Sequence, residues 1–180
     1  MTSPEQISLD RAKCFDLDAL AAIYDHYSPG IYRYALRLTG DPAHAEECTA
    51  ETFSRFLAAL KNGGGPADHL QAYLYRIAHN WITDFYRRNP VQEELSESLT
   101  GDLPSTAEAA EEEIVRAEVR QALRCLTPDQ QQVIVLKFIE GWDNEEIAHA
   151  LQKQVNAIKA LQHRAVEALQ RILLPEEINE

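Results

Sequence analysis

Residues 143–174, DNEEIAHALQKQVNAIKALQHRAVEALQRILL, predict two helices joined by a tight turn. Asp143, followed three residues later by Glu146, matches the capping box that starts a helix. The apolar spacing of this helix stops at residue 151, and a longer run with helical spacing begins at 156. Two helices separated only by residues 152–154 form a helix-turn-helix, whose second helix can enter the major groove of DNA.

The spacing of these two helices separates an apolar face from a polar one. The residues expected to pack together are Ile147, Ala148, Leu151, Ile158, Leu161, Ala165 and Leu169. The residues expected to point outward are Lys153, Asn156, Lys159, Ala160 and His163. The outward set suits contact with DNA, because the first residues of the second helix reach base edges in this motif. An ordinary helical hairpin with a solvated polar face has the same pattern, so this motif alone leaves both interpretations open.

The sequence on both sides of this motif also predicts helices, and no segment has the alternation of a strand. Capping-box patterns occur at Ser105 with Glu108 and at Thr127 with Gln130. In the carboxy-terminal half we expect helices at about 106–126, 128–140, 144–151 and 156–174. In the amino-terminal half we expect helices at 16–27, from 41 to about 62, and from 68 to about 89. The first of these should end at Pro29 and Gly30. The fold class is therefore all-α.

Charge divides the 180-residue chain into domains. The net charge of −12 disfavours tight binding of free DNA, but residues 91–118 alone carry −8, whereas 16–90 carry −2 and 119–174 carry +1. We expect a first domain at 1–90, an acidic linker at 91–106 and a second domain with the helix-turn-helix at 107–180. There is no amino-terminal apolar run of a signal peptide, so we expect a cytoplasmic protein. The three cysteines are far apart, and we expect them to be reduced and mostly buried.

A second polar face is expected on the helix that begins near residue 68. Arg76, Asn80, Thr83 and Arg87 are spaced by four, three and four residues and therefore share one side of the helix. Cations and an amide suit phosphate contact with some base reading. Aromatic residues on the same helix offer rings for stacking on unpaired bases: Tyr73, Trp81 and Tyr86. Trp81 lies in the apolar stripe, and core packing is its more ordinary role.

Three motifs carry a resemblance to bacterial sigma factors. Residues 74–88, LYRIAHNWITDFYRR, are similar to the promoter-melting helix of that family, and 41–53, DPAHAEECTAETF, resemble its polymerase-binding helix. LTPDQQ at 126–131, EEIA at 145–148, IK at 158–159 and HRA at 163–165 resemble its reader of the upstream promoter element. The match covers roughly 17–90 and 120–173, and the linker is too short for a further central domain. These features indicate the extracytoplasmic-function group.

This resemblance implies partners and site residues. Core RNA polymerase would be bound by Asp41, Glu46, Glu47 and Glu51. The downstream element and separated strand would be held by Arg76, Asn80, Arg87 and Arg88, and the loop at 61–69 would capture an extruded base. The upstream element would be held by Lys153, Asn156, Lys159, His163 and Arg164. An anti-sigma factor is a plausible further partner, and the acidic linker would lie in the basic RNA path of the polymerase.

The sequence departs from the family pattern at four places. The family usually has glutamine at the position of Ala50, and glycine and serine near Gln152 and Gln154. Many members have arginine at the position of Leu161. The first change removes one hydrogen-bonding group from the polymerase contact, and the others affect the turn and the reading of the upstream element.

The pattern contains no phosphate-binding glycine loop, metal-ligand cluster or activated nucleophile, so we expect no catalytic residue, no metal and no cofactor, and a protein that is not an enzyme. The principal hypothesis is a sigma factor that directs polymerase to promoters, initiates transcription and assists strand opening. One alternative is a stand-alone helix-turn-helix transcription regulator. Another is a helical protein-interaction module that does not bind DNA.

Overall fold

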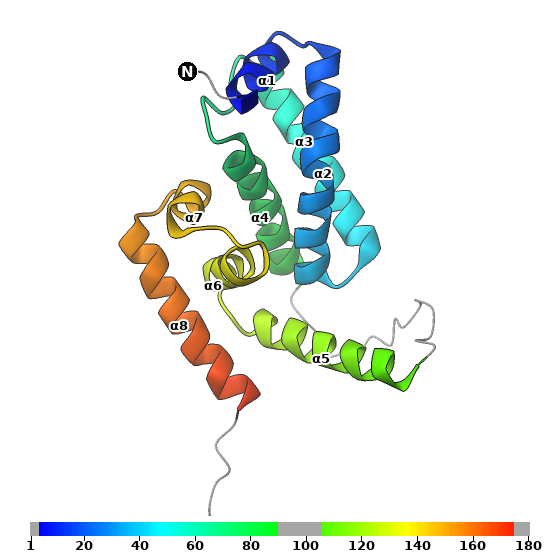
Figure 1. The fold of residues 1–180 in the computed structure, drawn as a ribbon, viewed down its shortest axis with the longest axis vertical. Helices are drawn as coiled ribbons and strands as arrows, with labels where there is room; N and C mark the ends of the chain where they lie inside the picture. Colours follow the sequence, from blue (N-terminus) through cyan, green and yellow to red (C-terminus); the bar gives the residue numbers. More distant parts are fainter. Residues whose placement is uncertain (1–3, 90–105, 175–180) are drawn as a thin grey trace, which may run out of the picture.

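The computed structural model describes residues 4–89 and 106–174 (Figure 1), and this part of the chain is helical without strands. The amino-terminal domain contains α1 (Pro4–Lys13), α2 (Leu17–Thr39), α3 (Pro42–Lys61) and α4 (Leu70–Arg88). The carboxy-terminal domain contains α5 (Ala107–Arg124), α6 (Pro128–Ile134), the π-helical segment η1 (Val135–Ile139), α7 (Asn144–Leu151) and α8 (Val155–Leu173). The prediction of an all-α fold with two helical domains is confirmed. The acidic linker predicted at 91–106 falls almost entirely outside the described residues.

The amino-terminal domain is built on α2, α3 and α4, with α1 lying across one end (Figure 1). Asp16 and Asp41 cap α2 and α3, because each carboxylate accepts hydrogen bonds from two amides of the following turn. The core between the three long helices is formed by Ile31, Tyr34, Phe56, Leu74 and Ile82, among other buried residues. Burial of these apolar side chains provides the main driving force for this packing.

Two features of this domain differ from the sequence predictions. The helix expected at 16–27 does not end at Pro29 and Gly30, because α2 continues to Thr39. A Cβ atom at Gly30 would lie 2.6 Å from the Tyr75 hydroxyl, so the missing side chain makes room for this ring from α4. Tertiary packing therefore outweighs the local preference for a turn. The short helix α1 was not predicted, and it is held by the buried side chains of Leu9 and Ala12.

The carboxy-terminal domain follows its capping signals. Thr127 and Gln130 form the predicted capping box of α6, and Asp143 and Glu146 form that of α7. The α5 prediction is corrected, since Thr106 and not Ser105 is the N-cap residue and accepts a hydrogen bond from the Ala109 amide. The helix predicted at 128–140 continues as η1, a π turn that contains one extra residue.

The two domains pack against each other along α4 and α7 and along α2 and α5 (Figure 1). The ring centroids of Tyr75 and Trp142 are 4.8 Å apart across this interface. The Arg37 guanidinium pairs with Glu140 at 2.5 Å, and Arg124 donates a hydrogen bond to the Thr39 carbonyl at 3.2 Å. The described domains therefore form a closed arrangement, which the sequence did not predict.

Candidate nucleic-acid interface

The helix-turn-helix consists of α7, the turn at residues 152–154 and α8. Ile147, Ile158 and Ala165 are buried between the helices, as the apolar spacing predicted. Gln152 adopts the left-handed conformation, with φ 53° and ψ 42°, and the Lys153 amide donates a hydrogen bond to the Ala148 carbonyl. This conformation disfavours residues with a Cβ atom, which explains the physical advantage of glycine near this position.

The start of α8 is polar and largely exposed. Gln154 is its N-cap residue but makes no side-chain capping hydrogen bond, whereas serine commonly caps a helix. The residues predicted to hold the upstream element are all exposed: Lys153, Asn156, Lys159, His163 and Arg164. Two of them have acidic neighbours, since Lys153 Nζ lies 3.1 Å from Asp129 and His163 Nδ1 lies 3.4 Å from Glu167.

The predicted polar face of α4 is present, but its members differ in exposure. Asn80, Arg87 and Arg88 are exposed, whereas Arg76 is half-buried and lies 5.2 Å above the Tyr73 ring centroid. Arg87 also lies 3.4 Å from Asp84. These side chains could contact an anionic backbone along one edge of α4.

The aromatic residues of α4 are partly used in packing. Trp81 is half-buried and stacks on Phe85, with ring centroids 5.4 Å apart and an interplanar angle of 9°. Tyr86 donates a hydrogen bond from its hydroxyl to the Leu38 carbonyl, which directs this polar end toward α2. Tyr73 keeps one face of its ring against the Arg76 guanidinium. Stacking of these rings on bases stays a prediction.

His79 lies beside this face but is buried, and it is not among the residues predicted from the sequence. Its Nδ1 lies 3.4 Å from the Tyr34 hydroxyl, and its Nε2 lies 3.4 Å from the Thr83 hydroxyl and 4.0 Å from an Asp129 oxygen. Burial lowers the pKa of His79 from 6.5 to about 4; the Asp129 carboxylate opposes this change and the Lys153 ammonium adds to it. The ring is therefore neutral in the closed arrangement at neutral pH.

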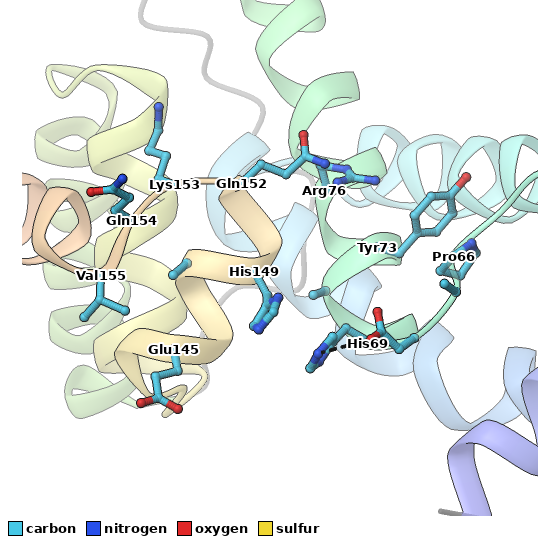
Figure 2. Close-up of a pocket in the computed structure, with 14 residues that line it drawn as sticks. Pro66, His69, Tyr73, Arg76, Glu145, His149, Gln152, Lys153, Gln154 and Val155 are labelled. Atoms are coloured by element: carbon cyan, nitrogen blue, oxygen red, sulfur yellow. Dashed lines mark ion pairs between the residues drawn. The ribbon is translucent and has the colours of Figure 1, made fainter. Parts of the chain in front are cut away.

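A cleft of about 830 Å³ separates the start of α4 from the helix-turn-helix (Figure 2). One wall contains Pro66, His69, Tyr73 and Arg76, and the other contains Glu145, His149, Gln152 and Lys153. The His69 and His149 rings stack across it, with centroids 3.9 Å apart. A second cleft is lined by Arg76, Asn80 and Thr83 on α4 and by Asp129 and Lys153 on the other domain. The closed arrangement thus brings the two predicted DNA faces together.

The predicted polymerase-binding residues lie on or beside α3. Glu46 and Glu47 are exposed, and Glu51 pairs with Arg55 at 2.7 Å. Asp41 differs from them, because its carboxylate accepts hydrogen bonds from the Ala43 and His44 amides as the cap of α3. An acidic, solvent-facing strip on this helix is available for a partner with positive charge.

The loop predicted to capture an extruded base lies between α3 and α4. Gly63 has a φ of 72° and Gly65 a φ of 97°, a region of the backbone that favours glycine. His69 also has a positive φ, 49°, and directs its ring to His149. The loop therefore contacts the second domain in the closed arrangement.

The described part of the chain offers little support for other types of site. Residues 4–89 and 106–174 contain no group of three potential metal ligands. Within the same ranges, no helix combines the length and the hydropathy needed to cross a membrane. The expectation that the cysteines are mostly buried is wrong, since Cys14 and Cys125 are exposed and only Cys48 is buried.

Two helical domains, one of which presents a helix-turn-helix with exposed cations, define a DNA-binding protein of the all-α class. Residues 23–90 match the family model described as Sigma-70 region 2, and residues 116–169 match that described as Sigma-70, region 4. The chain belongs to the ECF RNA polymerase sigma factors, since it also covers most of the length of curated members of that group at more than 30% identity.

Two curated relatives illustrate this similarity. The ECF RNA polymerase sigma factor SigL of Mycobacterium tuberculosis is 31% identical over 156 residues, which cover 86% of this chain and 88% of the relative. BldN of Streptomyces coelicolor is 32% identical over 169 residues, which cover 92% of this chain and 64% of the relative. The chain thus spans slightly less than two thirds of BldN.

A solved structure has the same fold. The structure of CnrH in complex with the cytosolic domain of CnrY matches with a TM-score of 0.73 and 21% identity, and the match covers 95% of this chain and 97% of CnrH. At this level of identity the match supports the helical architecture.

Proposed function

We propose that this chain is a transcription initiation factor that binds core RNA polymerase, directs it to specific promoters and assists strand opening in the cytoplasm. The observation that carries the proposal is the presence, in one chain and in the family's order, of a region 2 domain and a region 4 domain, each with a cationic face. Strand opening would use binding energy and base stacking, so the chain would act without being an enzyme.

The roles of individual residues form part of this proposal. Arg76, Asn80, Arg87 and Arg88 of α4 would hold the downstream element and the separated strand. Lys153, Asn156, Lys159, His163 and Arg164 would hold the upstream element. The exposed carboxylates of Glu46 and Glu47, with Glu51, would contact the polymerase. Asp41 would contribute through the start of α3, because its side chain already caps that helix.

Reconstitution with core polymerase tests this function. The full chain should copurify with core polymerase. The reconstituted enzyme should initiate transcription at specific promoters, which are identified by sequencing the transcripts that it makes. Tight specific binding to duplex DNA without polymerase would instead favour the stand-alone regulator. Absence of both polymerase binding and DNA binding would favour the protein-interaction module.

We also propose an anti-sigma factor as a partner. CnrH is bound to the cytosolic domain of CnrY, and the sigma factor RpoE of Bartonella quintana is bound to the anti-sigma factor NepR. RpoE matches this chain with a TM-score of 0.59 and 21% identity. Coexpression with candidate anti-sigma proteins, followed by competition against core polymerase, tests this partner.

A further inference from the structure

We propose that α8 reads bases along one line of side chains and holds phosphates at its two edges. Asn156 and His163 form this reading line, and Asn156 selects adenine. Lys159 and Arg164 hold the phosphates, and Glu167 positions the ring of His163. This inference rests on the proposed function, because it takes α8 as the helix that enters the major groove of the upstream element. It adds the base that is read, a separate task for each residue, and a role for Glu167, which is outside the proposed set.

Helical spacing places the reading line opposite the core. Two fully buried residues, Ile158 and Ala165, mark the side of α8 that packs against its own domain. Asn156 precedes Ile158 by two residues, and His163 likewise precedes Ala165. Since each residue of an α-helix advances by about 100°, both side chains lie about 160° from the buried side. Asn156 and His163 are exposed and differ by only about 20° around the axis, so they share one line that faces away from the domain.

The two cations lie on opposite edges of this line. Lys159 follows the buried Ile158 by one residue, and Arg164 precedes the buried Ala165 by one residue. Both cations are exposed, and they lie about 100° from the buried side in opposite directions. A major groove is about 12 Å wide and has a phosphate backbone on each side. Each cation can therefore reach one backbone, a contact that positions the helix but carries no sequence information.

Asn156 has the chemistry and the place of an adenine reader. It is the second residue of α8, and the first residues of a recognition helix reach base edges. An asparagine amide can donate to N7 of adenine and accept from its N6 amino group, a pair of atoms that only adenine presents in the major groove. Ala160 lies on the same line between Asn156 and His163. Its side chain is small and half-buried, so it leaves the floor of the groove open to both neighbours.

Glu167 lies one turn beyond His163 and directs its ring. The Glu167 Oε2 is 3.4 Å from His163 Nδ1, and the side chains of the pair are 56% and 74% exposed, respectively. A partner at one imidazole nitrogen determines what the other nitrogen presents. With Nδ1 turned toward the carboxylate, Nε2 is the nitrogen left for a base edge. Because a carboxylate repels DNA phosphates, Glu167 acts through His163 and not as a backbone contact.

The reading line also predicts the spacing of the bases. Asn156 and His163 are seven residues apart, a distance of about 10 Å along a helix. Base pairs of DNA are stacked about 3.4 Å apart. The two residues therefore read positions about three base pairs apart when α8 lies along the groove.

Asn156→Ala tests the adenine assignment in the full chain bound to core polymerase. The probes are promoter fragments that carry each of the four base pairs at every position of the upstream element. Wild type should prefer adenine at one position by about 5- to 150-fold, and Asn156→Ala should lose this preference at that position alone. Replacement of that adenine by 7-deazaadenine, which lacks N7, should weaken binding by wild type and leave Asn156→Ala unaffected. Gln170→Ala is the matched control, because Gln170 is exposed on α8 but lies about 21 Å farther along the helix.

The cations should respond in a different way to the same fragments. Lys159→Ala and Arg164→Ala should each weaken binding of all fragments by a similar factor. Each should also lower the salt dependence, measured as the slope of log affinity against log salt concentration, by about one unit. Asn156→Ala should leave this slope unchanged, because it removes no phosphate contact.

A double-mutant cycle tests the positioning role of Glu167. His163→Ala should remove a base preference about three base pairs from the adenine. Glu167→Ala should reduce that preference by about twofold, the size expected from an exposed ion pair, and should have no effect on it when His163 is already alanine. Glu167→Gln retains an acceptor for Nδ1 and should restore most of the preference.

The outcomes separate this inference from the proposed function. A loss of preference at several positions in Asn156→Ala, or in Gln170→Ala, would overturn the adenine assignment. A base-specific defect with an unchanged salt slope in Lys159→Ala or Arg164→Ala would contradict the division between bases and phosphates. An effect of Glu167→Ala that persists without His163 would remove its positioning role. If wild type with core polymerase fails to initiate transcription, the proposed function fails; if it initiates at specific promoters without a preference for adenine, only this inference fails.

Discussion

Acid should open the interface between the two domains through His79. The His79 side chain is only 10% exposed, and burial lowers its pKa from 6.5 to about 4. Asp129 attracts a proton on this ring and Lys153 repels it, while Tyr34 and Thr83 offer hydroxyl groups that stay neutral in this range. The closed state therefore binds fewer protons than a state in which water reaches the ring.

The sign and size of the effect follow from this difference in pKa. Above pH 6.5 the contribution of the neutral ring to the closed state is fully present, and it is lost as the pH falls from 6.5 toward 4. If opening hydrates the ring completely, protonation of the hydrated ring would favour the open state over the closed state by about 2 kcal/mol at pH 5. This difference corresponds to a rise of about 30-fold in the ratio of open to closed molecules. Partial hydration would give a smaller shift in the same direction.

The assay is energy transfer between dyes on Cys14 and Cys125 in a pH series from neutral to mildly acidic. His79→Gln retains a polar side chain beside Tyr34 but does not titrate, so its transfer should fall much less over this range. Both proteins should carry His149→Gln, which removes the stacked contact of His149 with His69 from the comparison. The same amplitude and midpoint with and without His79 would refute the reasoning.

Four further results are expected. Gly30→Ala should lower the free energy of unfolding by about 1–2 kcal/mol in thermal denaturation, because the overlap with Tyr75 outweighs the better helix propensity of alanine. Gln152→Gly and Gln154→Ser should each raise the free energy of unfolding by about 1 kcal/mol, because the first relieves a left-handed backbone conformation and the second adds a helix cap. An unchanged free energy of unfolding in either variant would contradict the turn geometry. The double variant Lys159→Ala, Arg164→Ala should weaken recruitment to the upstream element, whereas the double variant Asn80→Ala, Arg87→Ala should impair promoter melting. Each lost contact that reads a base should cost about 1–3 kcal/mol. Permanganate footprinting should show that unpaired thymines disappear only in the second double variant. Exchange of Glu93, Glu94, Glu97 and Asp102 for Gln and Ser should weaken binding to core polymerase at low salt, and the loss of affinity should be smaller at high salt because of screening. If the variant and the wild type bind core polymerase equally tightly at low salt, the linker is a simple tether.

The sequence predicted the elements whose signals are local. The capping boxes at Thr127 and Asp143 gave the starts of α6 and α7, and the apolar spacing around Ile147 and Ile158 gave the packing of the helix-turn-helix. These predictions succeeded because a cap and an amphipathic stripe are encoded within a few residues. The break expected at Pro29 failed, because a buried contact with Tyr75 lies 45 residues away and overrides the local preference.

The closed interface could not be predicted in the same way. Asp129, Glu140 and Trp142 have no shared motif, and each meets a partner in the other domain that is distant in sequence. His79 occupies a position in α4 that also fits an ordinary buried stripe. Asn156, Lys159 and His163 of α8 are exposed as predicted, whereas Ala160, also predicted to point outward, is half-buried. Arg76 is half-buried as well and lines the cleft between the domains.

The π turn η1 amounts to a one-residue insertion inside a helix. An added residue rotates everything beyond it by about 100° relative to a continuous α-helix. Phe138 and Ile139 in η1 face solvent, while Trp142, only three residues after the segment ends, is buried against Tyr75. Deletion of a single residue from η1 would therefore change which side chains contact the amino-terminal domain, although the composition of the helix would hardly change. The rotation that η1 introduces thus determines how the two domains fit together.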